Sequence, residues 1–165
     1  IADALELHEP AIMDANAEDI TAAELANTDA NLMNRLKMKP GKIAQLAEGA
    51  RQIAGMPEPI ARTLSKMEIA DGLVLTQVTA PLGVLLIIFE SRPDALPQIA
   101  SLAIRSGNGL LLKGGKEAQR TNQALHRVIV DCFPKFGVGR DCIVLVEGRE
   151  GTRWAFPNPG TLFYL

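Results

Sequence analysis

The sequence predicts an α/β domain with a parallel sheet. Residues 84–89 are six consecutive apolar residues, and a second apolar run, 110–112, follows a helix-like segment. Short apolar runs without polar alternation are typical of strands buried in a helix-covered sheet. Each run ends in a polar turn, Glu90-Ser91-Arg92-Pro93 or Lys113-Gly114-Gly115-Lys116. Since ligands gather at the carboxyl ends of parallel strands, we expect a binding site at these turns.

The N-terminal part is predicted to be helical, with two segments of opposite charge. Residues 1–31 contain eight acidic residues and no Lys or Arg, and an interruption is expected near Pro10. One helical face is lined by apolar side chains (Leu5, Ile12, Ile20 and Leu25). Residues 32–66 carry seven basic and two acidic residues, with helical spacing up to Gly55. We favour solvated charged faces; the alternative is a basic surface that attracts an anionic substrate.

The later elements alternate between strand and helix. Residues 73–79 alternate as a strand does, and residues 143–146 form another short apolar strand. Helices are predicted over 94–105, with an irregular first turn at Pro97, and over 117–136. Strands separated by helices imply right-handed crossovers and a parallel sheet.

The composition is that of an ordinary globular domain. Hydrophobic residues make up 47% of the 165 residues and charged residues 22%, and the net charge of -2 argues against a nucleic-acid partner. No apolar run approaches the roughly 20 residues that span a bilayer, so no membrane partner is expected. No basic-then-apolar leader is seen, and we expect a cytoplasmic location, with a plastid or mitochondrion as alternatives. Cys132 and Cys142 lack metal-ligand spacing and are predicted to be buried structural thiols.

Lys113-Gly114-Gly115-Lys116 is a candidate anion site. Glycines let the backbone approach a ligand, and a helix starting near Glu117 would offer unpaired N–H groups and the positive end of its dipole. The alternative is a plain glycine turn with solvated lysines. The G-x-x-x-x-G-K-[ST] and G-x-G-x-x-G fingerprints both fail, because Leu110, Glu117 and Leu112 occupy positions that those motifs reserve for other residues.

Glu90-Ser91-Arg92-Pro93 is the second candidate. Arg92 is suited to bidentate binding of a carboxylate or phosphate, next to a carboxylate and a hydroxyl. In the alternative, Ser91 caps the next helix and Glu90 forms a surface ion pair with Arg92. Spacing alone leans toward the alternative.

Residues 81–125 closely resemble gamma-glutamyl phosphate reductase, also called glutamate-5-semialdehyde dehydrogenase. The combination of E-S-R-P, S-G-N and K-G-G is highly specific, and further similarity lies at 32–36, 39–43 and 70–75. The sequence looks most like the reductase half of plant-type bifunctional delta-1-pyrroline-5-carboxylate synthase. The similarity covers roughly residues 1–146.

This resemblance implies the aldehyde dehydrogenase superfamily, whose Rossmann-like sheet lacks the usual glycine fingerprint and would be incomplete here. It implies reduction of L-glutamyl 5-phosphate to L-glutamate 5-semialdehyde in proline biosynthesis. The small-molecule substrate is attacked by a cysteine thiolate, and NADPH then delivers hydride to the thioester. A homo-oligomer is expected for the full-length enzyme.

The resemblance also assigns roles to residues. Lys113 matches a ribose-contacting lysine, and Lys116 stands where NAD-preferring relatives often carry Glu, so a cation there should accept the 2′-phosphate of NADP. The implied cofactor-binding residues are Ile88, Phe89, Glu90, Ser91, Lys113, Gly114, Gly115 and Lys116.

Two residues of the first turn are implied to act on the substrate side. Ser91 occupies the place of an Asn that helps to stabilise the oxyanion in relatives, so its hydroxyl is a candidate donor. Arg92 is the predicted substrate-binding residue.

The sequence departs from the family pattern at its end. The H-A-D-G-x-C nucleophile motif is absent, so no catalytic residue is assigned, and the alternative function is a non-catalytic remnant that binds nucleotide or a partner. We predict an NADP-binding part over 1–148 and a divergent, irregular tail over 149–165. The chain is expected to be a fragment, with a truncated or mis-spliced product, or translated intron, as the hypothesis for the tail.

Overall fold

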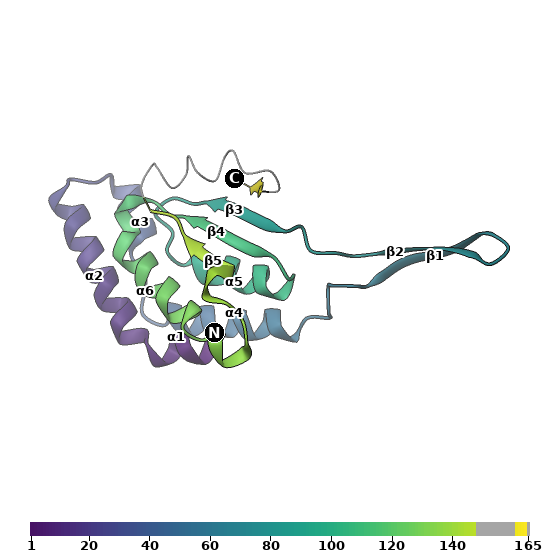
Figure 1. Cartoon of the computed structure of the whole chain (residues 1–165). Helices are drawn as coiled ribbons and strands as arrows, with labels where there is room; N and C mark the ends of the chain where they lie inside the picture. Colours follow the sequence, from purple (N-terminus) through teal and green to yellow (C-terminus); the bar gives the residue numbers. More distant parts are fainter. Residues whose placement is uncertain (148–160, 165) are drawn as a thin grey trace.

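A parallel sheet and a set of packed helices form the body of the chain (Figure 1). The computed structural model describes residues 1–147 and 161–164. Its α-helices are α1 (Ala2–Leu7), α2 (Glu9–Leu25), α3 (Ala30–Leu36), α4 (Lys42–Gly55), α5 (Ala95–Arg105) and α6 (Gln119–Val130). Short 3-10 turns are η1 (Lys116–Ala118), η2 (Phe133–Phe136) and η3 (Arg140–Cys142). The strands are β1 (Thr63–Ala70), β2 (Leu73–Val78), β3 (Val84–Ile88), β4 (Gly109–Lys113), β5 (Ile143–Leu145) and β6 (Thr161–Tyr164).

The central sheet has the strand order β5-β4-β3-β6, and each neighbouring pair is parallel. Val84 of β3 pairs with Gly109 of β4, and the register continues to Ile88 and Lys113. The connections through α5 and α6 step in the same direction along the sheet, so right-handed crossovers place both helices on one face. The predicted α/β class, with N-terminal helices followed by a parallel sheet, is confirmed.

The core lies between the sheet and α5 and α6. Leu110 and Leu112 of β4 are buried there with Leu96 of α5 and Leu125 and Ile129 of α6. Fully burying one side chain of this size stabilises the fold by roughly 1.5–3 kcal/mol. This packing fixes the ends of β3 and β4, where the two polar turns begin.

The N-terminal helices break close to the predicted position. His8 separates α1 from α2, and Pro10 lies in the first turn of α2, where its missing N–H removes no intrahelical bond. Ile12 is buried in the core, but Leu25 is 81% exposed. The predicted apolar face therefore ends before the last turn of α2.

Opposite charges join the N-terminal helices to their neighbours. The Arg51 guanidinium of α4 donates hydrogen bonds of 2.7 Å to Glu6 and Asp3 of α1. These hydrogen bonds hold the pKa of both carboxyls below its ordinary value. A hydrogen bond from Arg105 of α5 lowers the pKa of Glu58 in the same way. The acidic and basic segments are thus partly paired rather than only solvated.

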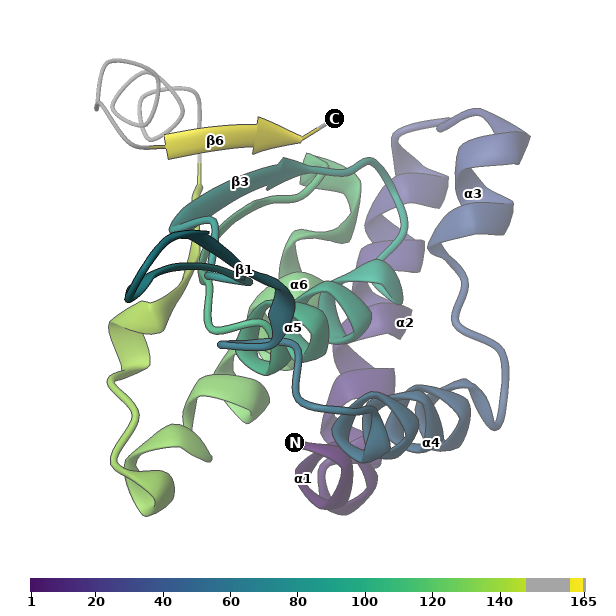
Figure 2. The same cartoon turned by 90° about the vertical axis from the view of Figure 1, so that its right-hand side faces the viewer.

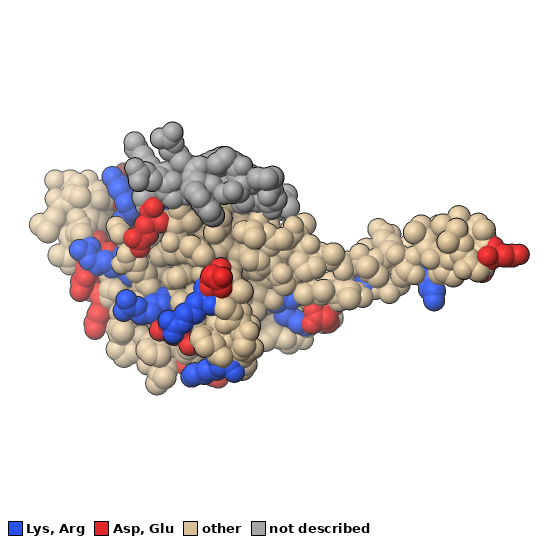
Figure 3. Space-filling view, viewed as in Figure 1, with Lys and Arg blue, Asp and Glu red and all other residues tan. Residues whose placement is uncertain are grey.

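Strands β1 and β2 form an antiparallel hairpin that projects from the body of the molecule (Figure 1). β2 falls within the predicted strand 73–79, whereas the sequence predicts no element at β1. Every residue of both strands is exposed, including the apolar side chains Leu64, Met67, Ile69 and Leu75. The arm carries few charged side chains (Figure 3). Exposed apolar surface of this kind marks a contact surface.

The predicted helices around the second turn need correction. The helix expected over 117–136 is interrupted, and its α-helical part ends at Val130. Pro134 then lies at the start of η2, where it cannot continue an α-helical hydrogen-bond ladder. The first turn of α5 is regular, because Pro97 lies within it and its missing N–H has no intrahelical partner there.

The end of the chain is described only at β6. Strand β6 belongs to the predicted irregular tail, 149–165, and pairs with β3. The rest of this tail lies outside the described residues. None of the described helices has the length and apolar character that a membrane span requires.

Candidate functional site

The two polar turns meet around one cavity of about 590 Å³, here called the β3–β4 cavity. Ile88 and Lys113 end their strands in register, and the Phe89 N–H donates a 2.9 Å hydrogen bond to the Lys113 carbonyl. All the predicted cofactor residues line this cavity: Ile88, Phe89, Glu90, Ser91, Lys113, Gly114, Gly115 and Lys116. Leu32 of α3, Asn122 of α6 and residues 145–147 complete its walls. The volume lies in the range of small-molecule sites.

Both glycines of the second turn are needed for its close packing. A Cβ on Gly115 would lie 3.2 Å from the Ser91 backbone nitrogen and 2.7 Å from a Glu117 carboxylate oxygen. A Cβ on Gly114 would collide with the side-chain nitrogen of Asn122. Gly115 has a φ of -64°, which any residue can adopt, so space and not conformation requires glycine there. Gly115 therefore lets the second turn pack against the first, and Gly114 lets it pack against α6, two contacts that the sequence does not reveal.

Two buried polar atoms at this cavity have no partner among the described residues. Ser91 is 1% exposed and its Oγ makes no hydrogen bond. Its φ of +40° is a strained value for a residue with a side chain. Asn122 is 2% exposed and its Oδ1 is also unpartnered. Since buried polar groups are normally paired, both atoms are candidates to bind a ligand.

Neither feature of the structural alternative for the first turn is seen. The residue that precedes α5 is Asp94, and Ser91 gives α5 no cap. Among the described residues, Glu90 and Arg92 make no ion pair with each other. Asn122 was missed at the sequence level because it occupies an ordinary helical position, and only the fold brings it to Gly114.

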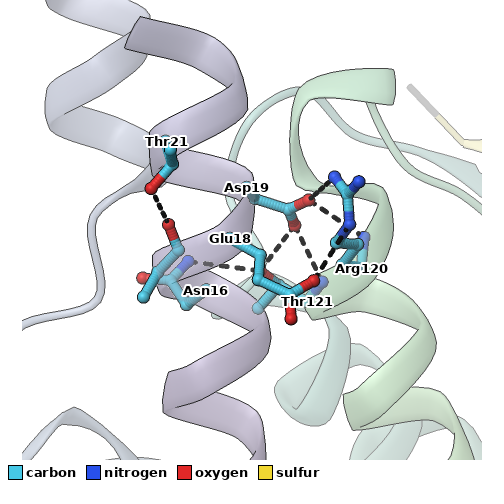
Figure 4. Close-up of polar contacts among 7 residues, drawn as sticks. Asn16, Glu18, Asp19, Thr21, Arg120 and Thr121 are labelled. Carbon is cyan, nitrogen blue, oxygen red and sulfur yellow. Dashed lines mark hydrogen bonds and ion pairs between the residues drawn. The ribbon is translucent and has the colours of Figure 1, made fainter.

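The start of α6 differs from the predicted anion site. The Asp19 carboxylate of α2 accepts hydrogen bonds from the backbone N–H groups of Arg120 at 3.2 Å and Thr121 at 2.8 Å, and from the Thr121 hydroxyl at 2.8 Å (Figure 4). Asn16 donates to that hydroxyl at 3.2 Å. A side chain from another helix thus caps α6. Two of the expected unpaired N–H groups of this helix, those of Arg120 and Thr121, are occupied by a protein carboxylate and are not free for a ligand anion.

The β3–β4 cavity has mixed charge. Lys113 and Lys116 face it together with the carboxylates of Glu90, Glu117 and Glu147. Carboxylates accept hydrogen bonds from hydroxyl groups, and lysines attract phosphate. A ligand with both hydroxyl and phosphate groups suits this lining better than a bare anion.

Arg92 is separated from the other predicted site residues. It lines a different cavity, of about 440 Å³, with residues of α3 and α4. Consecutive residues of one turn, Ser91 and Arg92, therefore face different cavities.

The cysteines stand apart from both cavities. Cys132 is half-buried and its thiol donates to the Val128 carbonyl at 3.2 Å, while Cys142 is exposed and not buried as predicted. Cys142 ends η3 at the edge strand β5, where little packs over it. Over residues 1–147 and 161–164, no three His, Cys, Asp or Glu side chains gather as a metal site would require.

The fold defines a class of protein. A propionaldehyde dehydrogenase from Rhodopseudomonas palustris superimposes with a TM-score of 0.55, at 17% identity, over 99% of this chain and 40% of that chain. The sheet with its two turns is thus an aldehyde dehydrogenase fold. No family model matches the sequence.

Within this class the chain is similar to gamma-glutamyl phosphate reductases. The enzyme from Saccharomyces cerevisiae is 37% identical, with a TM-score of 0.84 over 90% of this chain and 39% of that chain. Delta-1-pyrroline-5-carboxylate synthase from Mesembryanthemum crystallinum is 58% identical over 150 residues, 91% of this chain and 21% of that protein. The chain therefore spans about a fifth of that relative. The resemblance seen in the sequence is confirmed.

Proposed function

We propose that this chain is the cofactor-binding part of an NADPH-dependent enzyme that reduces L-glutamyl 5-phosphate to L-glutamate 5-semialdehyde in proline biosynthesis. The observation that carries the proposal is the convergence of the eight predicted residues on the β3–β4 cavity. The similarity to gamma-glutamyl phosphate reductases supports the same function.

The residues of the cavity fit a dinucleotide with hydroxyl and phosphate groups. Ser91 Oγ and Asn122 Oδ1 are buried atoms with no partner among the described residues, and a bound ligand would satisfy them. Glu90 and Glu117 offer acceptors for ribose hydroxyls, and Lys116 offers a cation for the 2′-phosphate. When bound, NADPH supplies hydride to the acyl group of the substrate.

Reversal of the charge at Lys116 tests the preference for NADPH over NADH. Lys116→Glu should weaken NADPH binding by about tenfold or more and NADH binding far less, because only NADPH carries the 2′-phosphate. Fluorescence titration measures both affinities. Lys135→Glu is the matched control, since Lys135 is exposed on η2 and lines neither cavity. Equal losses for NADPH and NADH would contradict the assignment of Lys116.

The isolated chain should bind cofactor without turnover. Neither Cys132 nor Cys142 lines the β3–β4 cavity, and the H-A-D-G-x-C motif is absent from the sequence. Oxidation of NADPH by this chain in the presence of glutamyl phosphate would refute this part of the proposal.

Two further proposals concern organisation. Residues 1–148 act as the NADP-binding part, and the segment 149–165 adds strand β6 to its sheet. The full-length enzyme is a homo-oligomer, and the exposed apolar arm β1–β2 supports this, because such a surface is normally covered. Light scattering measures the molar mass, and hence the oligomeric state, of the full-length enzyme and of its Leu75→Lys variant.

A further inference from the structure

The second cavity, here called the basic cavity, is lined by charged side chains of one dominant sign. Its volume is about 440 Å³. It is built from the end of α3, the connection to α4, the first turn of α4 and the turn after β3. The charged residues of its lining are Arg35, Lys37, Lys39, Lys42, Arg92 and Asp94. Five cations against one carboxylate leave an excess of four positive charges.

Most of this charge is not neutralised locally. Lys42 forms an ion pair of 2.8 Å with Asp94, and Lys37 reaches Glu24 of α2 at 3.7 Å. In the described part of the chain, Arg35, Lys39 and Arg92 form no ion pair. Uncompensated like charges repel one another around a small cavity, so an anionic ligand would stabilise their arrangement.

Two helix N-termini add to the positive potential. The Lys42–Asp94 ion pair joins the first residue of α4 to the residue that precedes α5. Figure 2 shows that α4 and α5 both begin on the side of the molecule on which α3 lies. Neither helix start has a side-chain cap. The positive ends of a 14-residue and an 11-residue helix therefore lie together at this cavity.

The basic cavity and the β3–β4 cavity are lined by neighbouring residues of the chain. Ser91 lines one and Arg92 the other, and consecutive Cα atoms are only about 3.8 Å apart. On α3, Leu32 lines the β3–β4 cavity and Asn34 the basic cavity. A ligand in the basic cavity would thus lie across one turn of backbone from the ligand of the other cavity.

We propose that the basic cavity binds the phosphate group of a small acyl phosphate substrate, with Arg92, Arg35 and Lys39 as its recognition residues. The identity of the substrate rests on the proposed function, whereas the anion site rests on the charges and helix ends described above. A small anion is favoured over a polyanionic macromolecule because the cations line a cavity and the whole chain is slightly acidic, with a net charge of -2. Arg92 supplies a planar fork that matches phosphate.

Binding of inorganic phosphate to the full chain, followed by 31P NMR, tests the site. Arg92→Gln and Lys39→Gln should each weaken phosphate binding by about tenfold, since each removes one charge-assisted contact. Both side chains are exposed, so neither substitution should unfold the chain. Lys135→Gln is the control and should leave the affinity unchanged. NADPH affinity should not change in any of the three variants.

The outcomes separate this inference from the proposed function. Phosphate binding that is equally strong in Arg92→Gln, Lys39→Gln and the control would overturn the anion site. Displacement of NADPH by phosphate that disappears in Arg92→Gln would also overturn it, because one shared site would then explain both ligands. If NADPH does not bind while phosphate binding depends on Arg92 and Lys39, the proposed function fails and the anion site is supported.

Discussion

Asp19→Asn should destabilise the chain by disconnecting α2 from α6. Asp19 is 2% exposed, and one carboxylate oxygen accepts both the Thr121 N–H and the Thr121 hydroxyl at 2.8 Å. The other oxygen accepts the Arg120 N–H at 3.2 Å. The Asn side chain keeps one oxygen as an acceptor, but its NH₂ group replaces the other oxygen and then faces a backbone N–H donor.

The expected cost follows from these three hydrogen bonds. Bonds to a charged acceptor contribute about 1.5–3 kcal/mol each and neutral ones about 1 kcal/mol. Two bonds lose their charge assistance and the third is lost, so unfolding free energy should fall by about 3 kcal/mol. With a urea m-value of about 2 kcal/mol/M, the midpoint should drop by about 1.5 M.

Urea unfolding followed by circular dichroism measures this shift. Asp14→Asn is the matched control, because it makes the same chemical change at an exposed position of α2. The control should stay within about 0.5 kcal/mol of the unsubstituted chain. If Asp19→Asn shifts the midpoint no more than Asp14→Asn, the capping role of Asp19 is refuted.

Two other substitutions probe the turns and the helix contacts. Gly115→Ala should lower the unfolding free energy by about 1–3 kcal/mol through overpacking against Ser91, and it should also weaken NADPH binding. Gly49→Ala, with open space around the residue, should have neither effect. Equal urea midpoints for the two variants would contradict the packing argument. Arg51→Gln should destabilise the chain at pH 7 and much less at pH 3. Because the pKa of the two α1 carboxyls is lowered in the folded chain, their ion pairs with Arg51 stabilise the fold fully above the ordinary pKa. This stabilisation is lost as the pH falls through the lowered pKa. A difference in urea midpoint that does not change with pH would contradict this linkage.

The site was predictable from the sequence where its geometry is set by local pattern. Apolar runs identified β3 and β4, and the rule that ligands gather at strand ends placed the two turns together. The eight residues at the β3–β4 cavity were therefore identified without a structure, whereas Arg92 of the same turn lines the other cavity. The capping of α6 by Asp19 could not be predicted, because Asp19 lies 102 residues from Thr121 in the sequence.

Other features escaped the sequence argument for definable physical reasons. β1 has register shifts at Thr63/Ser65 and at Glu68/Ala70, which break the period of two that identifies a strand. Its apolar side chains are exposed, so no polar and apolar faces distinguish it. The division between the two cavities depends on the directions of Ser91 and Arg92, which the local sequence does not specify.

The contact between α2 and α6 has a consequence for synthesis on the ribosome. α2 emerges long before α6, yet Asp19 and one of the hydrogen bonds of Asn16 find their partner on α6. Until then its inward surface is covered only in part, by Leu36, Met38 and their neighbours, and contacts between distant segments form slowly. α2 thus completes its native contacts only after the start of α6 has emerged, and a chaperone can protect its inward surface during this interval.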